Sequence, residues 1–457
     1  MDRKYFGTDG IRGVANRFPM TAQMAMRVAM AAAQIIRKNH PSRENRVVIG
    51  KDTRLSCYML EQALGAGFLS MGMDVIFLGP IPTPAVAMMT RSLRADLGVM
   101  VSASHNPYHD NGIKLFGPDG YKLPDDMELQ IEALIESARL EDALAAPDMV
   151  GHASRLEDTQ GRYAEFIKSS LARSVSFEGL KIVVDCANGA GYKVAPSVLW
   201  EMGADIISIG VTPNGKNIND KCGATHTELL QETVKREKAD LGIALDGDAD
   251  RVILVDEKGN RLDGDQIMAA IATSMSEQGV LNGNCVVATV MSNLGLERYF
   301  YPRGIELVRS SVGDRYVVEA MRSRGANLGG EQSGHIILSD FATTGDGLLA
   351  GLQATSILKA SGKPASETFK LFEPVPQILK NLRLAEGLSA ANVLNNDKTS
   401  MAVKKAEHAL ARQGRLLVRA SGTEPVIRVM AEGDDPQIIE SIVNDLCDEI
   451  AKVSAAS

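Results

Sequence analysis

Short apolar runs rich in Val, Ile and Leu alternate along the chain with longer amphipathic stretches. Residues 47–50, 74–78 and 96–101 are runs of the first kind, and the intervals between them have the period of helices. Parallel strands need crossover connections, usually helical, because the chain must return to the same edge of the sheet. The pattern therefore predicts an α/β fold with largely parallel sheets covered by helices. Thr21 is the expected N-cap of the first helix, which should continue to Arg37.

This order of elements occurs twice more. Further strands are expected at residues 181–185, 205–211, 240–245, 285–290, 305–308 and 326–328. In each set of three, the last strand leads into an unusual polar loop, at residues 102–107, 246–251 and 329–335. Open α/β sheets bind ligands beyond the carboxyl ends of their strands, so these loops are candidate functional sites. We interpret the sets as three related α/β domains, while a coincidental similarity of α/β patterns stays open.

Closely spaced prolines at residues 372–376 predict a linker, and residues 145–151 predict another. A smaller α+β domain is predicted after residues 372–376. It should contain a helix, two short strands at 416–419 and 426–430, and a final helix from Pro436. The expected fold is thus three α/β domains with mixed, largely parallel sheets plus this C-terminal domain. The expected boundaries are 1–155, 156–255, 256–370 and 371–457.

The composition narrows the class of protein. Of 457 residues, 45% are hydrophobic and 23% charged, as in soluble globular proteins. No stretch approaches the roughly 20 apolar residues of a membrane span, and residues 1–10 lack the apolar core of a signal peptide. Five scattered cysteines predict neither disulfides nor a zinc site, and the net charge of −8 argues against unspecific nucleic-acid binding. We expect a cytoplasmic protein with a small-molecule partner, no nucleic acid and no membrane.

Three carboxylates occupy alternate positions in the second polar loop, at Asp246, Asp248 and Asp250. Such groups repel one another unless they are solvated or bind a cation, and the small residues between them allow the loop to turn all three toward one ion. A solvated acidic turn is the alternative. A calcium-binding EF-hand is not supported, because Arg251 stands where that loop requires Gly. We predict a divalent metal site with positions left for phosphate oxygens.

Ser104 lies in the first polar loop, within the sequence SASHNP. Its hydroxyl can attack phosphorus if a nearby metal screens the negative charge that builds up. An ordinary turn, with Asn before Pro, is the competing interpretation, and no GxSxG motif of a hydrolase surrounds the serine. Beyond it, residues 110–114 (DNGIK) predict a tight turn followed by Lys114, which is either functional or simply solvated.

Three further segments combine glycine with polar residues. The loop GEQSGH at residues 330–335 offers a carboxylate, a hydroxyl and an imidazole, which suits sugar hydroxyls, or it forms a structural turn. The segment RASGTEP at residues 419–425, with Arg428 beyond it, suits a phosphate group, although a hydrogen-bonded turn is the alternative. The N-terminal GTDGIRG at residues 7–13 places Arg12 among glycines that allow close approach to an anion.

Together, GTDGIRG, SASHNP, DGDADR, GEQSGH and RASGTEP, in this order over essentially the whole chain, resemble the α-D-phosphohexomutase family. The start of the chain, GGEQSGH and TTGDG at residues 343–347 look most like the bacterial members that interconvert glucosamine 6-phosphate and glucosamine 1-phosphate for UDP-N-acetylglucosamine and cell-wall synthesis. The resemblance implies four domains around a central cleft, an isomerase that transfers phosphate within a sugar, and one Mg²⁺ per chain.

The resemblance also implies a role for each matching residue. Ser104 is the phosphoserine, and its phosphate completes a Mg²⁺ site made by Asp246, Asp248 and Asp250. Glu331 and Ser333 bind sugar hydroxyls. The non-reacting phosphate of the substrate is bound by Arg419, Ser421, Gly422, Thr423 and Arg428. The reacting group is surrounded by Arg12, Arg251, Lys114 and His335, with Lys114 or His335 transferring the proton.

The implied reaction consists of two phosphoryl transfers through a sugar 1,6-bisphosphate, which is also a candidate activator. Glucose and mannose phosphates are alternative substrates, because few loop residues distinguish these sugars. A Mg²⁺-dependent sugar phosphatase, with an Asp of residues 246–250 as nucleophile, and a non-catalytic phosphosugar sensor are the other classes considered. A homodimer stays open.

Overall fold

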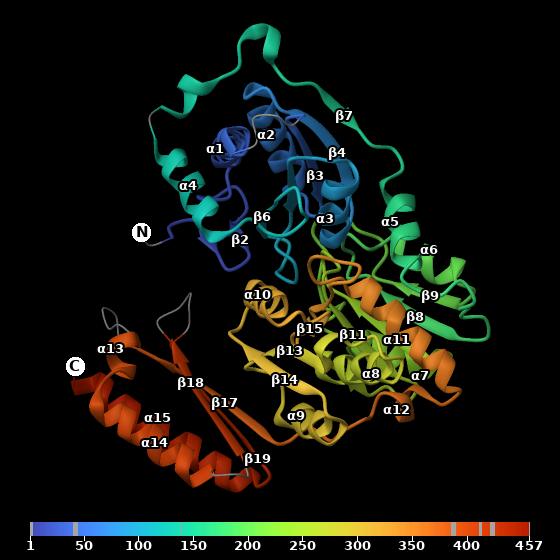
Figure 1. Ribbon diagram of the computed structural model, residues 1–457, viewed down its shortest axis with the longest axis vertical. Helices are drawn as coiled ribbons and strands as arrows, with labels where there is room; N and C mark the ends of the chain where they lie inside the picture. Colours follow the sequence, from blue (N-terminus) through green and yellow to red (C-terminus); the bar gives the residue numbers. More distant parts are fainter. Residues whose placement is uncertain are drawn as a thin grey trace. The chain divides into compact units, whose positions relative to one another are not determined.

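The computed structural model describes residues 3–39, 44–137, 139–384, 390–410, 414–420 and 426–456. The chain divides into two compact units (Figure 1). The first unit comprises Met1–Thr289 with Val308–Leu371, and the second comprises Val290–Leu307 with Phe372–Ser457. Within the described part of the chain, none of the helices has both the length and the apolar character needed to cross a membrane.

A mixed seven-stranded sheet in the order β1-β2-β6-β5-β3-β4-β7 begins the first unit. Its strands are β1 (Phe6–Gly7), β2 (Gly10–Val14), β3 (Arg46–Lys51), β4 (Asp74–Pro80), β5 (Leu97–Val101), β6 (Asp110–Phe116) and β7 (Ala153–Arg155). Its helices are α1 (Ala22–Asn39), α2 (Cys57–Ser70), α3 (Thr83–Ser92) and α4 (Asp125–Glu136). Strand β3 is parallel to β4 and β5, whereas β6 runs antiparallel to β5 and β2. The antiparallel strands place the N-terminal hairpin beside β6.

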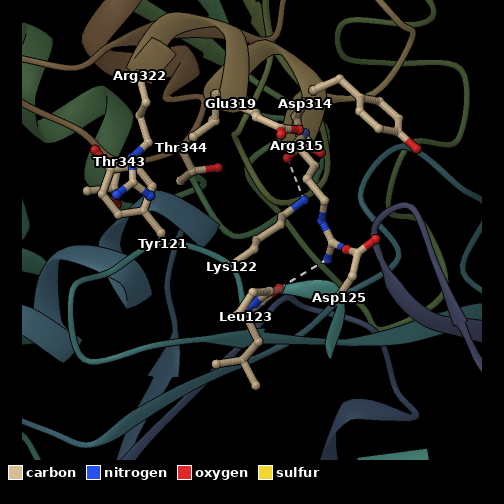
Figure 2. A pocket seen from close by; sticks show the side chains of 13 residues that line it. Tyr121, Lys122, Leu123, Asp125, Asp314, Arg315, Glu319, Arg322, Thr343 and Thr344 are labelled. Carbon is tan, nitrogen blue, oxygen red and sulfur yellow. Dashed lines mark hydrogen bonds and ion pairs between the residues drawn. The ribbon is translucent and has the colours of Figure 1, made fainter. Parts of the chain in front are cut away.

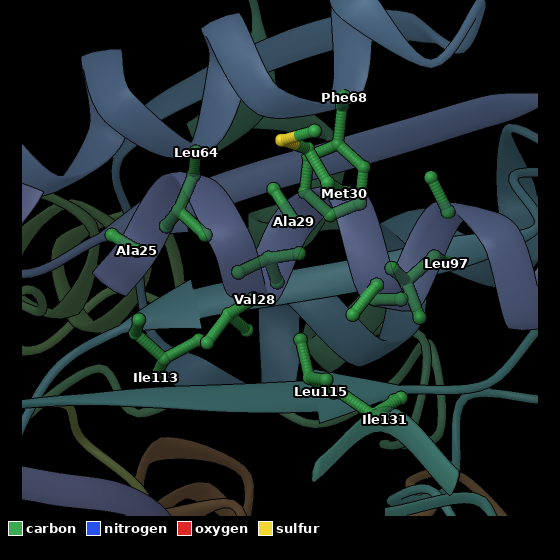
Figure 3. Packing of buried hydrophobic residues seen from close by; sticks show 14 of the residues in the cluster. Ala25, Val28, Ala29, Met30, Leu64, Phe68, Leu97, Ile113, Leu115 and Ile131 are labelled. Carbon is green, nitrogen blue, oxygen red and sulfur yellow. The ribbon is translucent and has the colours of Figure 1, made fainter. Parts of the chain in front are cut away.

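Helices α1, α2 and α4 share one hydrophobic core with this sheet (Figure 3). Val28 of α1 and Leu64 of α2 lie over strand residues such as Leu97 and Ile113, and all four are buried. Complete burial of an aliphatic side chain of this size contributes about 1.5–3 kcal/mol. The core therefore fixes the strands whose ends hold the polar loops.

Two further sheets follow along the chain. The five-stranded sheet, in the order β12-β11-β10-β8-β9, contains β8 (Lys181–Asp185), β9 (Asp205–Ile209), β10 (Leu241–Leu245), β11 (Val252–Asp256) and β12 (Arg261–Leu262). The four-stranded sheet, in the order β14-β13-β15-β16, contains β13 (Cys285–Thr289), β14 (Glu306–Ser310), β15 (Leu328–Gly330) and β16 (Ile336–Leu338). The accompanying helices are α5 (Thr159–Lys168), α6 (Val194–Glu201), α7 (Glu228–Glu237), α8 (Gly264–Glu277), α10 (Asp314–Arg324), α11 (Gly347–Ser361) and α12 (Ala365–Thr368).

The second unit contains an antiparallel three-stranded sheet with β19 in the centre. Its strands are β17 (Gln377–Arg383), β18 (Gly414–Ala420) and β19 (Val426–Gly433), and its helices are α9 (Leu294–Phe300), α13 (Ala390–Leu394), α14 (Asp397–Leu410) and α15 (Pro436–Ala456). Helices α14 and α15 cover one face, where Ile427, Val429 and Val443 are buried. Because side chains alternate along a strand, Arg419 and Arg428 belong to the other face.

The α/β class predicted from the sequence is confirmed, and Thr21 caps α1 by accepting the Met24 N–H at 3.2 Å. Two local predictions were wrong. Residues 110–114 belong to β6 and not to a tight turn, because Ile113 and the apolar residues beyond it pair with β5 and enter the core. Residues 329–330 end β15, although their glycines were assigned to the polar loop. In both places, glycine within a strand was mistaken for the sign of a turn or loop.

Candidate active site

The surrounding protein holds the Ser104 loop tightly at the end of β5. Ser104 has a left-handed backbone, with φ 51°, which costs of the order of 1–3 kcal/mol outside glycine. Its N–H donates to Ser102 Oγ at 2.9 Å, and its carbonyl accepts from Arg54 at 3.1 Å and from Asn219 at 2.9 Å. Ser104 is only 1% exposed. Its hydroxyl is therefore fixed in a buried position before any ligand arrives.

The Ser104 hydroxyl meets the acidic loop that follows β10. Ser104 Oγ donates to Asp246 Oδ2 at 2.6 Å. The two loops approach closely because Gly247 has no side chain: a Cβ there would lie 2.5 Å from the Ser104 carbonyl oxygen. The sequence prediction that these two loops meet is supported by this contact, although they are 142 residues apart.

Asp246, Asp248 and Asp250 are buried, and one oxygen of each lies within 4.8 Å of the others. Burial and the charges of Asp250 and Asp248 raise the pKa of Asp246 well above its usual value. Asp248 Oδ1 and Asp250 Oδ1 are buried, and within the described part of the chain neither has a hydrogen-bond partner. Carboxylate oxygens left without donors in a buried cluster fit a hard divalent cation, which would supply the missing positive charge. The acidic triad could bind a metal ion.

Lys114 projects from β6 into the same cluster. Its ammonium group lies 2.8 Å from Asp248, 3.2 Å from Asp250 and 3.3 Å from Asp9. Burial alone would lower the pKa of Lys114, but the three carboxylates outweigh this effect and raise it well above its usual value. Lys114 is 1% exposed, so the solvated lysine considered from the sequence is excluded. The residue is a buried cation beside the candidate metal ligands.

His335 lies between two carboxylates. Its Nδ1 is 3.7 Å from Asp250 and its Nε2 is 3.7 Å from Asp314. Burial disfavours the imidazolium form, but these carboxylates raise the pKa of His335. The Gly345 N–H donates to Nε2 at 3.1 Å, which favours the neutral ring with its proton on Nδ1. Its ring faces a carboxylate of the acidic triad, so His335 lies beside the other candidate groups, as a proton-transfer group requires.

Two guanidinium groups lie near the serine loop. Arg12 forms an ion pair with Asp9, and neither Arg12 Nε nor Arg251 Nε has a hydrogen-bond partner in the described structure. Burial together with the charges of Arg251 and Arg12 lowers the pKa of His105, the neighbour of Ser104, to about 4. Buried guanidinium donors that are still free can bind an anion through charge-assisted hydrogen bonds. The structure thus brings both predicted arginines to the side of Ser104.

The predicted sugar-binding loop connects β15 to β16. Ser333 Oγ donates to Glu331 Oε2 at 3.1 Å, and the Gly313 N–H donates to Glu331 Oε1 at 3.2 Å. Gly313 caps the N-terminus of α10, where the helix dipole favours a negative charge. The carboxylate and the hydroxyl are therefore adjacent and oriented, as a pair of sugar hydroxyls would require.

Only part of the predicted phosphate site falls within the described residues. Arg419 on β18 is directly opposite Arg428 on β19. Burial and the charge of Arg428 lower the pKa of Arg419, and the Nε atoms of both arginines have no hydrogen-bond partner among the described residues. Ser421, Gly422 and Thr423 lie outside the described residues.

Sequence reasoning missed several residues that hold this site together. Asp9 lies inside GTDGIRG but was passed over in favour of Arg12, although a carboxylate beside an arginine was a usable signal. Lys122 and Asp314 pair with each other across 192 residues and had no motif around them. Arg54 and Asn219, which fix the serine loop, also had no local signal, because only the fold brings them to Ser104.

Four family descriptions match the chain in order. They are the phosphoglucomutase/phosphomannomutase α/β/α domains I, II and III, at residues 3–142, 161–259 and 263–375, and the C-terminal domain of the same family, at residues 379–449. The chain is 59% identical to the phosphoglucosamine mutase of Rhodospirillum rubrum over 452 residues, covering 99% of each protein. It is 58% identical to the phosphoglucosamine mutase of Agrobacterium fabrum, covering 100% of both.

Solved structures have the same fold. A phosphoglucomutase/phosphomannomutase family protein from Burkholderia thailandensis matches with a TM-score of 0.80 and 24% identity, over 98% of this chain and 97% of that one. The N-acetylphosphoglucosamine mutase of Aspergillus fumigatus, solved with GlcNAc-6P and magnesium, matches with a TM-score of 0.67 and 18% identity, over 99% of this chain and 96% of that one. At these identities the structural likeness supports the fold.

Proposed function

Because the chain belongs to the phosphoglucomutase/phosphomannomutase family of α-D-phosphohexomutases, we propose that it interconverts glucosamine 6-phosphate and glucosamine 1-phosphate. Such an enzyme is an isomerase that moves a phosphoryl group within one sugar. The full-length relatives at 58–59% identity are phosphoglucosamine mutases, which favours the hexosamine substrate. The observation on which the chemistry rests is the 2.6 Å contact between Ser104 Oγ and Asp246 within a buried acidic triad.

In the proposed reaction the enzyme begins with phosphate on Ser104. The free sugar hydroxyl attacks this phosphorus, the bond from phosphorus to Ser104 Oγ breaks, and the hydroxyl loses its proton to a basic group. The resulting 1,6-bisphosphate turns over within the enzyme. Ser104 Oγ then takes the other phosphoryl group and releases the isomeric monophosphate, so the phosphoserine is restored and phosphate is conserved. The same bisphosphate, added from outside, would phosphorylate an unmodified Ser104.

The first unit's own residues supply the electrostatic environment for this transfer. Arg12 and Arg251 bind the oxygens of the moving phosphoryl group through their free donors. His335 or Lys114 transfers the hydroxyl proton. Mg²⁺, held by Asp246, Asp248 and Asp250 with the Ser104 phosphate as a further ligand, would neutralise charge on the phosphoryl oxygens.

Substrate recognition is divided between two groups of residues. Glu331 and Ser333 accept and donate hydrogen bonds to neighbouring sugar hydroxyls. Arg419 and Arg428, with Ser421, Gly422 and Thr423, bind the phosphate that does not react, and they must accept either end of the sugar.

The decisive experiment offers the purified chain glucosamine, glucose and mannose 6-phosphates in turn, with Mg²⁺ and a catalytic amount of the corresponding 1,6-bisphosphate. Isomerisation and free phosphate are both followed by ³¹P NMR. We expect the highest kcat/KM with glucosamine 6-phosphate and no net release of phosphate. Faster turnover of glucose or mannose phosphate would overturn the substrate assignment, and release of inorganic phosphate without isomerisation would indicate a phosphatase.

A further inference from the structure

Six side chains of the first unit form a closed ring in which acidic and basic groups alternate. In order around the ring they are Asp250, Lys114, Asp9, Lys122, Asp314 and His335. The longest contacts are the two of 3.7 Å on either side of His335. We call this set the charge ring. It links a candidate metal ligand, both candidate proton-transfer groups and three residues to which no role has yet been given.

Lys122 has an unusual place in the charge ring. It contacts none of the candidate metal ligands, yet its ammonium group pairs with both Asp9 of the β1–β2 turn and Asp314 at the start of α10. Its side chain is 12% exposed, as is that of Asp314. Exposed ion pairs contribute little to stability, whereas removing one partner of a buried pair is strongly destabilising. We call the contacts of Lys122 with Asp9 and Asp314 the Lys122 bridge.

Lys122 and Asp314 line a cavity of about 440 Å³ between the segment before α4 and helix α10 (Figure 2). Arg315 adds a second connection across this cavity, donating to the Leu123 carbonyl at 3.3 Å and to Glu128 at 2.8 Å. Farther along α10, the Arg322 guanidinium lies over the Tyr121 ring at 4.9 Å. The first turn of α10 is therefore tied through Asp314 to Lys122, in the segment after β6, and through Arg315 to Leu123 and to Glu128 of α4.

The same turn of α10 also touches the sugar-binding loop. Gly313, one residue before Asp314, donates its N–H to Glu331 at 3.2 Å. Asp314 itself lies 3.7 Å from His335 Nε2. A shift at the start of α10 would consequently move the partner of a sugar-binding carboxylate and the partner of a proton-transfer group together.

We propose that Lys122 is a positioning residue for the phosphoryl transfer: the Lys122 bridge sets the distance from the Ser104 phosphate to the sugar hydroxyl by fixing α10, and with it Glu331 and His335, to the N-terminal hairpin. This role rests on the proposed function. It predicts that loss of Lys122 affects turnover more than substrate affinity, since Arg419 and Arg428, which bind the non-reacting phosphate in the proposed function, have no part in the Lys122 bridge. A displacement of about 1 Å in such a site can reduce the rate by roughly 100-fold.

The test uses the full-length chain with Lys122→Met, Lys122→Arg, Asp314→Asn, the Lys122→Met/Asp314→Asn double variant, and Arg322→Met as the matched control on the same cavity. We expect K122M to lower kcat by roughly 10- to 100-fold while KM changes less than about threefold. K122R keeps the charge and enough donors for both carboxylates, so it should regain most of the turnover. R322M should leave kcat within about twofold of the wild-type value.

The double variant and hydrogen exchange separate positioning from a general loss of stability. If Lys122 and Asp314 act through one contact, the double variant loses no more turnover than the worse single variant. Exchange of the amides of residues 313–316 and 331–335 should accelerate in K122M and not in R322M. Wild-type kcat in K122M, multiplied losses in the double variant, or unchanged exchange would each overturn the proposal. If the wild-type chain fails to isomerise glucosamine 6-phosphate, the proposed function is wrong. The hydrogen exchange of residues 313–316 and 331–335 then tests by itself whether Lys122 fixes α10.

Discussion

In the first unit Lys114 lies within 3.3 Å of three carboxylates, whereas in the second unit Arg419 lies directly opposite another cation, Arg428. The cations of the charge ring have acidic partners, so that site keeps its geometry without a ligand. Like charges opposite each other on neighbouring strands destabilise a sheet, and among the described residues neither arginine offers its Nε to an acceptor. The difference teaches that the cations of the charge ring are neutralised within the fold, while the Nε atoms of Arg419 and Arg428 have no acceptor among the described residues.

The largest effect that would break this assignment comes from Ser104→Ala. If covalent chemistry belongs to the first unit, the loss of the Ser104 hydroxyl, which donates to Asp246 of the acidic triad, should reduce mutase turnover by at least roughly a thousandfold. Steady-state isomerisation, with intact-mass analysis for protein-bound phosphate, checks both turnover and modification. The exposed Ser323→Ala on α10 is the control and should behave as wild type. Wild-type turnover in S104A would remove Ser104 from the mechanism.

Metal removal should have the next largest effect. Chelation with EDTA leaves three buried carboxylates repelling one another and removes a charge worth several kcal/mol in the transition state, so activity should fall at least roughly 100-fold and return with Mg²⁺. Mg²⁺ at 100 times its Kd should also stabilise the folded chain by about 2.7 kcal/mol, measured as a rise in Tm.

Asp248→Asn tests whether that stabilisation comes from the acidic triad. The variant should lose most of the Mg²⁺-dependent rise in Tm, because one of the charged ligands is gone. Asp445→Asn, on the exposed surface of α15, changes the net charge equally and should keep it. An equal rise in Tm for both variants would place the metal elsewhere.

The second unit contains its own contrast between two arginines on the same face of one sheet: Arg415 is opposite a carboxylate, whereas Arg419 is opposite another arginine. Arg415 is opposite Glu432, which is fully buried and accepts from Arg415 Nε at 2.9 Å and from the Leu294 N–H at 2.8 Å. Glu432→Gln would leave the guanidinium charge unpaired and should destabilise this unit by about 3 kcal/mol. Faster hydrogen exchange of β18 and β19, with KM within about twofold of wild type, would fit this structural role. Unchanged exchange in E432Q would mean that the ion pair of Arg415 with Glu432 does not stabilise the second unit.

The fold was largely predictable because its signals are local. Apolar runs identified β3, β5, β8 and β10 to within a residue or two, and the hydroxyl of Thr21 identified the start of α1. The failures occurred where a short polar sequence is a strand only because of its neighbours. DNGIK has the composition of a turn, but antiparallel pairing with β2 and β5 makes it β6 and buries Lys114.

The candidate site was predictable only where several groups of one chemistry occur in a short segment. The spacing of Asp246, Asp248 and Asp250 favours a cation site, and the structure brings one oxygen of each within 4.8 Å of the others. Ser104 became informative through the other motifs and the family resemblance. Lys122 and Asp314 are not part of any recognisable motif, and each is one charged residue among many in the sequence. Their ion pair exists only because the fold brings α10 to the segment after β6. The sequence therefore drew attention to candidate residues that share a short motif, and it missed the residues whose contacts exist only in the fold.

The smallest expected effect tests the pair of like charges formed by Arg419 and Arg428. Arg428→Met should raise KM for glucosamine 6-phosphate roughly 10- to 30-fold, the value of one charge-assisted hydrogen bond to phosphate, and change kcat by less than about threefold. Unlike E432Q, it should not destabilise the second unit and should even stabilise it by about 0.2–1 kcal/mol, because a like-charge contact with Arg419 is relieved.

Lys405→Met removes the same charge from the exposed surface of α14, on the other side of that sheet, and is the matched control for R428M. Its KM should equal that of wild type, since a remote exposed charge is screened by salt. An equal rise in KM for both variants would reduce the role of Arg428 to general electrostatic attraction. A rise in R428M alone, together with unchanged or increased stability, would establish that the unpaired arginines are kept unpaired for the substrate phosphate.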